Sequence, residues 1–345
     1  HPYFGNVVFQ QMTKENSGLS SNNTRRVLED PYGNIWVGNY STGVDFIPGI
    51  GSPFQINQAV EDAKINVSAI YIDKKDNLWI GEDNKVMTYK GGEITRSWDF
   101  SPYISNSSSF VYLFTEDKQG NIWFGTTDNG ALKLNPATGA ITKIACTKAI
   151  DVNALFTDHN GTVWIGGESG VFTVSGEKET VEAKINKAIG ASSIPFSIIE
   201  DRYGKIWVGT LARGIFVFDR NRNLVAHLGE KAPFPSSSIN QIISDENGGI
   251  WVATHLGLVY VPDARKPTNY KVFNDKQGLK DNHIRALAQD RMGNIWLSTF
   301  SGIACFDVNK QKFFNFDYKS GIPMGNFVIG AAAVSSTGTV YFGSP

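Results

Sequence analysis

The sequence predicts an all-β fold, because one short motif recurs at regular spacing along the whole chain. An acidic residue is followed by a turn with glycine and then by an aromatic residue in a β-branched run. The copies are Asp30–Trp36, Asp73–Trp79, Asp117–Trp123, Asp158–Trp164, Asp201–Trp207, Asp245–Trp251, Asp290–Trp296 and the degenerate Ser335–Tyr341. Successive aromatic residues lie 43, 44, 41, 43, 44, 45 and 45 positions apart. This period is typical of a β-propeller with one four-stranded antiparallel blade per repeat. The copies predict a single propeller over residues 1–345 with eight blades, or alternatively seven blades and one separate repeat.

The repeat around Trp207 shows how one blade is expected to form. Residues 194–200 are a β-rich run for the innermost strand, followed by strands at 206–209, 214–218 and 223–228. Between the first two, Asp201 can accept backbone N–H bonds and Gly204 can supply a positive φ, as a tight turn requires. We expect the repeated tryptophans to pack between neighbouring blades. A small residue two positions after the aromatic, such as Gly209, indicates close packing at that point. No segment has a sustained helical apolar period, so almost no helix is predicted.

The two ends of the chain resemble two parts of one blade. Residues 7–12 are similar to the outer strand at 270–273, and each is followed by a Gly-Leu-x-x-Asn segment. The last repeat, by contrast, stops after its second strand. We therefore expect the N-terminal strand, at about residues 7–12, to close the last blade, built from 328–343, because ring closure removes free sheet edges. We also expect the native chain to continue on both sides.

The composition excludes some classes of protein. The chain has 345 residues, 41% of them hydrophobic, and a formal net charge of −1. A near-neutral charge without basic runs argues against a nucleic-acid partner, whose phosphates are bound by clustered Lys and Arg. Cys146 and Cys305 lie far apart in the repeats and are interpreted as buried apolar residues rather than as a disulfide. No apolar stretch approaches the ~20 residues that span a bilayer.

The repeat as a whole resembles a known family. The combination of Gly-Leu-Ser-Ser-Asn, Glu-Asp-x-x-Gly-Asn-Ile-Trp-Val-Gly and the following Gly-hydrophobic strand is similar to the two-component regulator propeller repeat. Departures are modest: Asp76 replaces a turn glycine, and the last copy lacks both Asp and Trp. The resemblance implies a place in the extracytoplasmic sensor region of hybrid two-component systems of gut Bacteroidetes. In these systems, two propellers precede a β-sandwich, a transmembrane helix and a kinase.

Several expectations follow from that resemblance alone. It implies that this chain is the second propeller of a membrane-anchored, periplasmic receptor for oligosaccharides from glycan breakdown. Signal transduction would then pass to a kinase outside the chain. The neighbouring propeller and β-sandwich of the same chain would be partners, and the intact receptor would be a homodimer. The resemblance does not specify the glycan.

Candidate ligand-binding residues come from counting positions within the repeat. The position five residues before each repeat Asp lies near the channel end of the innermost strand and reads Arg25, Ser68, Tyr112, Asn153, Phe196, Asn240, Arg285 and Gly330. Two positions further on, every residue is apolar: Val27, Ile70, Phe114, Leu155, Ile198, Ile242, Leu287 and Ala332. Since alternate residues share a strand face, we interpret the first ring as a channel lining and the second as core. The candidates from the first ring are Arg25, Tyr112, Asn153, Asn240 and Arg285.

Loops between the second and third strands reach the same face and add Tyr40, Arg213, His255 and Phe300. Amides, guanidinium groups and an aromatic ring suit a neutral or acidic sugar. In an eight-bladed ring Arg25 and Arg285 would flank Gly330, which favours a carboxylate or sulfate. The alternative for the whole set is a solvated channel rim.

Two other classes of function, an enzyme and a protein–protein scaffold, remain open at this point. A propeller lyase would need a metal and a histidine, and His255 and His283 are the candidates for that histidine. A retaining glycoside hydrolase would need two carboxylates about 5 Å apart. Asp128 and Glu168, at equivalent positions in neighbouring repeats, are the candidates for that pair. A protein–protein scaffold is the third reading. The sequence shows no catalytic constellation and no metal-ligand spacing, so we predict a non-enzymatic segment with no catalytic residue, metal or cofactor.

Overall fold

The computed structural model describes residues 13–14, 19–29, 35–40, 42–47, 54, 65–91, 93–105, 109–148, 150–191, 193–229, 233–317, 320, 322 and 327–344. The chain divides into two compact units, His1–Ile56 with Phe316–Met324, and Asn57–Asn315 with Gly325–Pro345. In the first unit, β1 (Thr24–Glu29), β2 (Ile35–Asn39) and β3 (Val44–Ile47) form an antiparallel sheet in that order.

The second unit contains seven sheets that follow one another along the chain. Six of them have four strands each. These are β4 (Ala69–Ile72), β5 (Leu78–Gly81), β6 (Lys85–Lys90) and β7 (Glu93–Asp99); β8 (Val111–Glu116), β9 (Ile122–Thr126), β10 (Gly130–Leu134) and β11 (Ile141–Lys143); β12 (Val152–Thr157), β13 (Val163–Gly167), β14 (Gly170–Ser175) and β15 (Lys178–Val181); β16 (Pro195–Glu200), β17 (Ile206–Thr210), β18 (Ile215–Phe218) and β19 (Leu224–Leu228); β20 (Ile239–Ser244), β21 (Ile250–Thr254), β22 (Gly257–Val261) and β23 (Lys271–Phe273); and β24 (Ile284–Gln289), β25 (Ile295–Thr299), β26 (Gly302–Asp307) and β27 (Lys312–Phe316). In the seventh, β28 (Ala332–Val334) pairs with β29 (Val340–Phe342).

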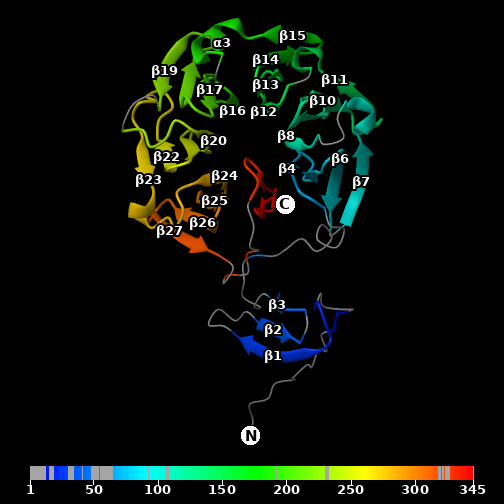
Figure 1. Ribbon diagram of the computed structural model, residues 1–345. Coiled ribbons are helices and arrows are strands. Elements are labelled where there is room, and N and C mark those ends of the chain that lie inside the picture. Colours follow the sequence, from blue (N-terminus) through cyan, green and yellow to red (C-terminus); the bar gives the residue numbers. More distant parts are fainter. Residues whose placement is uncertain are drawn as a thin grey trace. The chain divides into compact units, whose positions relative to one another are not determined.

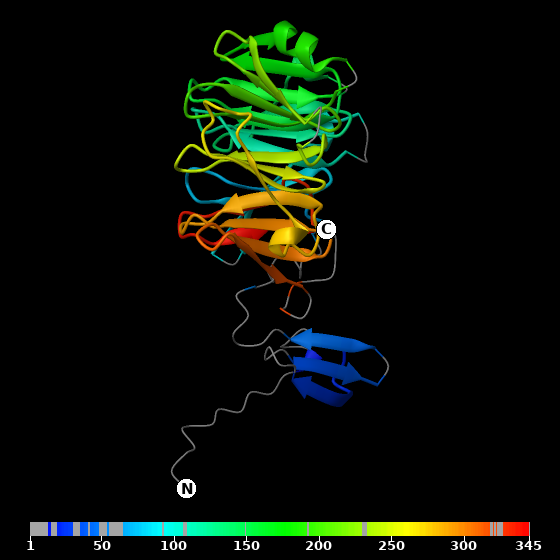
Figure 2. The same cartoon turned by 90° about the vertical axis from the view of Figure 1, so that its left-hand side faces the viewer.

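The short helices of the described chain lie in connections between strands. They are η1 (Ser101–Tyr103), η2 (Ala145–Thr147), η3 (Asp275–Gln277) and the seven-residue α3 (Ala183–Ile189). The sequence did not predict α3, which connects β15 to β16, packs against β14 and β18 and buries Ile185 and Ile189. Figure 1 shows the sheets of the second unit arranged in a ring. Figure 2 shows the same ring edge-on, with turns and connections on its two faces.

In most sheets of the ring, a glycine on or directly after the second strand lets the sheet approach the next one. A Cβ at Gly81 would lie 2.7 Å from Cβ of Val111, and one at Gly209 would lie 2.6 Å from Cγ2 of Ile239. Both contacts are closer than real Cβ atoms tolerate, so the predicted close packing at this position is confirmed. The partner is a buried apolar residue at the start of the next innermost strand.

The same contact closes the ring between its last and first sheets. A Cβ at Gly343, directly after β29, would lie 3.2 Å from Cγ1 of Val67, just before β4. Asp76 Oδ1, in the β4–β5 turn, accepts the backbone N–H of Ser336, in the β28–β29 turn, at 2.6 Å. Sheet β28–β29 therefore packs directly against sheet β4–β7, and it also contacts β24.

These contacts decide how the eight repeats are distributed. The all-β propeller fold is confirmed, with one sheet for each of the eight motifs. The closed ring contains seven of those sheets, as in the seven-blade alternative, and the β1–β3 sheet is assigned to the other unit. Residues 7–12, expected to close the last sheet, lie outside the described residues.

The motif aspartate organises the hairpin turn between the first and second strands. Asp201 Oδ1 accepts the N–H groups of Tyr203 and Lys205, each at 2.9 Å, and Gly204 has φ of 77° as predicted. Asp201 Oδ2 in turn accepts the indole Nε1–H of Trp207 at 2.9 Å. The same indole bond, at 2.8–3.1 Å, links Asp73, Asp117, Asp158, Asp245 and Asp290 to the tryptophan six residues later.

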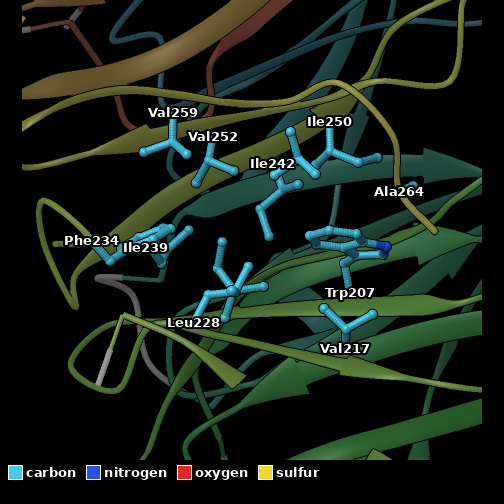
Figure 3. Packing of buried hydrophobic residues seen from close by; sticks show 12 residues of the cluster. Trp207, Val217, Leu228, Phe234, Ile239, Ile242, Ile250, Val252, Val259 and Ala264 are labelled. Carbon is cyan, nitrogen blue, oxygen red and sulfur yellow. The ribbon is translucent and has the colours of Figure 1, made fainter. Parts of the chain in front are cut away.

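The hydrophobic core lies between neighbouring sheets, as predicted for the tryptophans. Trp207 is fully buried and belongs to a cluster with Ile239, Ile242 and Val252 of sheet β20–β23. Figure 3 shows its ring beside these side chains, with Val217 and Leu228 from its own sheet. Because each sheet contributes to the core on both sides, the ring provides a rigid frame for the loops at its ends.

Candidate ligand-binding site

The candidate positions of the channel-lining ring coincide with β-bulges. In five first strands of the second unit the register with the second strand shifts around one extra residue: Tyr112, Asn153, Phe196, Asn240 and Arg285. Arg25 of β1 in the first unit occupies the same kind of bulge. A bulge leaves one residue out of the ladder and changes the direction of its side chain. The predicted strict alternation between this position and the residue two further on is therefore wrong, because the extra residue interrupts the period of two.

The apolar ring follows the core prediction only in part. Phe114, Ile198, Ile242 and Leu287 are buried. Val27 in the first unit is 64% exposed. Of the described residues, only Arg26 O lies within 4 Å of a Cβ placed at Gly38 of the same sheet. Val27 thus lacks the packing that buries its counterparts in the ring.

Four sequence-predicted candidates come together on two neighbouring sheets, β20–β23 and β24–β27. His255, in the β21–β22 turn, stacks on His283, with ring centroids 3.9 Å apart and an angle of 26° between the rings. Phe300, in the β25–β26 turn, meets His283 edge-on at 4.7 Å and lies under the Arg285 guanidinium, whose Cζ is 4.6 Å from the ring centroid. With Asn240 these residues form what we call the histidine–arginine cluster: Asn240, His255, His283, Arg285 and Phe300.

Asn240 fixes the tautomer of His255. Its side chain is buried, and Nδ2 donates to the carbonyl oxygen of Ile284 at 2.7 Å. Since a carbonyl can only accept, Oδ1 is the other end of the amide and is itself an acceptor. His255 Nε2 lies 3.2 Å from that Oδ1 and therefore carries the hydrogen. In neutral His255, Nδ1 is consequently the nitrogen that can take up a proton.

Arg285 is a half-buried cation that no carboxylate neutralises within the described chain. Its Nε donates to the carbonyl of Phe327. The ion pairs formed among the described residues do not include it. Burial lowers the pKa of the guanidinium, which means that desolvation of the charge is not fully compensated. A group in this state attracts an anion.

The two histidines respond to the same environment. Burial, and then the charge of Arg285, lowers the pKa of His255. Burial, His255 and Arg285 lower the pKa of His283, while Asp281 acts in the opposite direction. The Asp281 carboxylate accepts the backbone N–H groups of His283 and Ser301, at 3.0 and 3.1 Å. Both imidazoles are therefore held toward the neutral form.

The other candidates occupy different surroundings. Tyr112 is half-buried and meets Phe110 edge-on at 4.9 Å; burial and then the carboxylates of Asp151, Asp128 and Glu168 raise its pKa. Asn153 is half-buried at the bulge of β12. This side of the ring is acidic, in contrast to the histidine–arginine cluster.

Arg213 contacts another element of the ring, and the pair Arg25–Tyr40 belongs to the first unit. Arg213 Nη1 donates to the Ile189 carbonyl at the end of α3, at 2.6 Å, so its guanidinium fastens that helix to the β17–β18 connection. Arg25 lies 6.0 Å from the ring centroid of Tyr40 within the first unit, where Tyr40 is 72% exposed. The sequence missed the role of Arg213 because it did not predict α3.

The predicted pairing of Arg25 with Arg285 around Gly330 is wrong. That prediction placed eight sheets in one ring, whereas the sheet beyond Gly330 is β4–β7, with Ser68 at the equivalent position. Gly330 does leave room: a Cβ there would meet no atom within 4 Å, and its N–H donates to the Arg285 carbonyl at 3.0 Å. Arg285 is accompanied by histidines instead of a second arginine. His283, two residues before Arg285, was the available signal.

The structure also bears on the enzymatic alternatives. Within the described ranges, no three His, Cys, Asp or Glu side chains are grouped to hold a metal ion. Glu168 lines a cavity of about 290 Å³ together with Asn186 and Ser193, on the acidic side. No helix in the part of the chain that the structure describes has the length and apolarity to cross a membrane.

A closed ring of seven radial sheets, six of them four-stranded, with a different kind of side chain at most of the bulges, defines a β-propeller. Residues 18–41, 105–128, 189–212, 233–255 and 278–301 match the family model described as two component regulator propeller. Five repeats of the chain thus match this family model, as the resemblance predicted.

Relatives of known sequence or structure agree with this assignment. Over 288 residues the chain is 25% identical to histidine kinase P4 of Formosa agariphila. The aligned region is 78% of this chain and 18% of that protein. It is similar to the extracellular domain of a putative hybrid two-component system from B. thetaiotaomicron, with a TM-score of 0.76 and 29% identity over 98% of this chain and 46% of that one. The chain thus spans less than half the length of either relative.

A lyase also shares the architecture. Virginiamycin B lyase from Staphylococcus aureus matches with a TM-score of 0.65 and 13% identity, over 81% of this chain and 92% of the lyase. At this identity the likeness concerns the fold alone.

Proposed function

We propose that this chain is a ligand-binding sensor propeller in the periplasmic part of a hybrid two-component system, and that it detects an oligosaccharide. The observation that carries the proposal is the convergence of Asn240, His255, Arg285 and Phe300 on two neighbouring sheets. The match of five repeats to the family model supports the sensor role, and the likeness to an extracellular domain supports the location. Signalling to a kinase would be the task of segments outside this chain.

The chemistry of the cluster suits a sugar. Phe300 is 46% exposed and offers an aromatic face for the apolar side of a pyranose ring. Arg285 provides guanidinium donors, and the imidazoles can donate or accept. These groups lie on turns and bulges, so they can contact a ligand without disturbing the ladder. Within the intact receptor, the neighbouring propeller, the β-sandwich and a second copy of the chain would be the protein partners.

A lyase is the second candidate, favoured by the shared propeller fold and by two histidines on the loop face. The two functions differ in products. Incubation with a glycan panel should give no new reducing ends and no unsaturated products if the chain is a sensor. Turnover that is lost in His255→Ala would establish the lyase instead.

Binding is tested by calorimetry with the same panel of acidic and neutral oligosaccharides. The sensor proposal expects at least one oligosaccharide to bind wild type and to bind Phe300→Ala more weakly. Arg291→Ala is the matched control, because it removes an exposed arginine from the β24–β25 turn at the other end of the same strands. Unchanged affinity in Phe300→Ala, or an equal loss in Arg291→Ala, would place the ligand elsewhere.

A further inference from the structure

The histidine–arginine cluster combines one charged and two titratable groups, none of which forms an ion pair with a described residue. The Arg285 guanidinium packs over Phe300, and among the described residues its side-chain hydrogen bond is the one from Nε to a backbone carbonyl. Two imidazoles stacked at 3.9 Å lie on the same side. If both became protonated, three positive charges would face one another, which is unfavourable unless an anion lies between them.

The elements packed around the histidines contain few other charges. Asp281 precedes β24 and contributes the one carboxylate that acts on His283. Both of its oxygens already accept backbone N–H groups. Arg285 of β24 acts on both histidines. Among the described residues, Asn240 of β20, Phe300 of the β25–β26 turn and the Phe327 carbonyl also contact the cluster, and none of these groups titrates in this range.

The tautomer of His255 determines which ring nitrogen takes up a proton. Because Nε2 donates to Asn240, protonation adds a hydrogen at Nδ1, and the ring then donates from both nitrogens. The imidazole thereby gains a donor for a ligand oxygen without losing its anchor. An anion bound beside Arg285 would stabilise that protonated form, as opposite charges do at short range.

We propose that the histidine–arginine cluster binds an anionic group of the ligand, a carboxylate or sulfate, and that binding is coupled to proton uptake by His255 and His283. The affinity therefore rises as the pH falls. This inference rests on the proposed function for the sugar part of the ligand, but not for the anion. By linkage, each histidine whose pKa rises by one unit on binding makes the anion bind about tenfold more tightly at low pH than at high pH.

Inorganic sulfate tests the coupling without knowledge of the natural ligand. The histidine Cε1 carbons are labelled with ¹³C and titrated by NMR from pH 5 to pH 8.5, in chloride and in sulfate at equal ionic strength. We expect sulfate to raise the pKa of His255 and His283 by about one unit, the scale of an added opposite charge. His159 is the internal control, because it is 62% exposed and lies beside Glu200 in a turn of the opposite face. An equal response of all three histidines would overturn the proposal.

Variants separate coupling from simple folding defects. His255→Asn and His283→Asn should retain sulfate binding at pH 8 but flatten its pH dependence, whereas Arg285→Gln should weaken binding at every pH. A variant that fails to fold is recognised by lost chemical-shift dispersion, and the wild-type titration then decides alone. An acidic oligosaccharide that binds equally at pH 5 and pH 8 would refute the coupling and leave the sensor function standing. Sulfate-coupled titration without binding of any oligosaccharide would support the anion site and refute the sugar ligand.

Discussion

Trp207 donates its indole N–H to the Oδ2 atom of Asp201 at 2.9 Å, inside the hairpin turn that Asp201 also caps. Both residues are buried. One carboxylate therefore holds a turn through Oδ1 and a core side chain through Oδ2. The repeated spacing of six residues between Asp and Trp is a consequence of this bond.

Replacement of Asp201 by Ala should destabilise the ring by about 2–4 kcal/mol, because it leaves a buried indole N–H and two turn N–H groups without acceptor. The free energy of unfolding from denaturant titration is the measurement. Asp219 is a matched control: it accepts the N–H groups of Asn221 and Asn223 in the same way but holds no indole. Asp219→Ala should cost clearly less, and equal losses would mean that the indole bond contributes nothing.

Gly204→Val should lower stability by about 1–3 kcal/mol, since a β-branched residue is strained at positive φ. The added Cβ would also lie 2.5 Å from Nε of Arg220. Gly176→Val provides the comparison, because Gly176 has φ of 61° but open space around it. The melting midpoint should fall in both and further in Gly204→Val, with ligand affinity unchanged.

A chain that begins at Asn57 should fold as a closed ring, because Gly343 meets Val67 and Asp76 binds Ser336 without help from the β1–β3 sheet. We expect one cooperative thermal transition close to that of the ring in the full chain. Loss of cooperative unfolding in the shortened chain would show that the first repeat is needed for closure.

Arg285→Ala should weaken binding of an acidic oligosaccharide by about 1.5–3 kcal/mol, the range for hydrogen bonds to charged groups. Folding should change little, because Arg285 is half-buried and its Nε makes a single bond to a backbone carbonyl. Calorimetry with the acidic sugar and its uncharged analogue gives the answer. The loss should shrink for the analogue, and the same loss for both would exclude a charge contact.

The stability of the ring should decrease as the pH falls below about 6.5. The pKa values of His255 and His283 are lowered in the folded state, so the unfolded chain binds more protons between the folded values and the ordinary value of 6.5. The free energy of unfolding therefore rises with pH across that window. His255→Asn combined with His283→Asn should reduce this slope. An unaltered slope in the double variant would locate the effect elsewhere.

The fold was predictable because its determinants are local. Turn chemistry at Asp201 and Gly204 and the aromatic at Trp207 recur at one period, and each acts within a few residues. The number of sheets in the ring was not predictable in this way, since it depends on a contact between Gly343 and Val67, which lie at opposite ends of the ring's series of repeats. No local pattern determines which repeat closes against which.

The sequence predicted where the candidate site lies, but not which side chains contact one another there. Counting from the repeat aspartate found Asn240 and Arg285, although the bulge that makes the position special leaves no mark in residue type. The stacking of His255 on His283 depends on the approach of two connections from neighbouring sheets. Arg213 was misread because the acceptor for its guanidinium belongs to a helix without a clear apolar period.

At the bulged positions the residue type can vary without a change in the strand pairing of the ring. A bulged residue is supernumerary to the strand pairing, so the ladder on either side places few demands on its identity. Within this one chain that position already holds Arg, Tyr, Asn and Phe on the same backbone. A propeller of this kind can therefore acquire a new chemical preference by exchanging single residues, while the inherited architecture of turns, glycines and tryptophans remains intact.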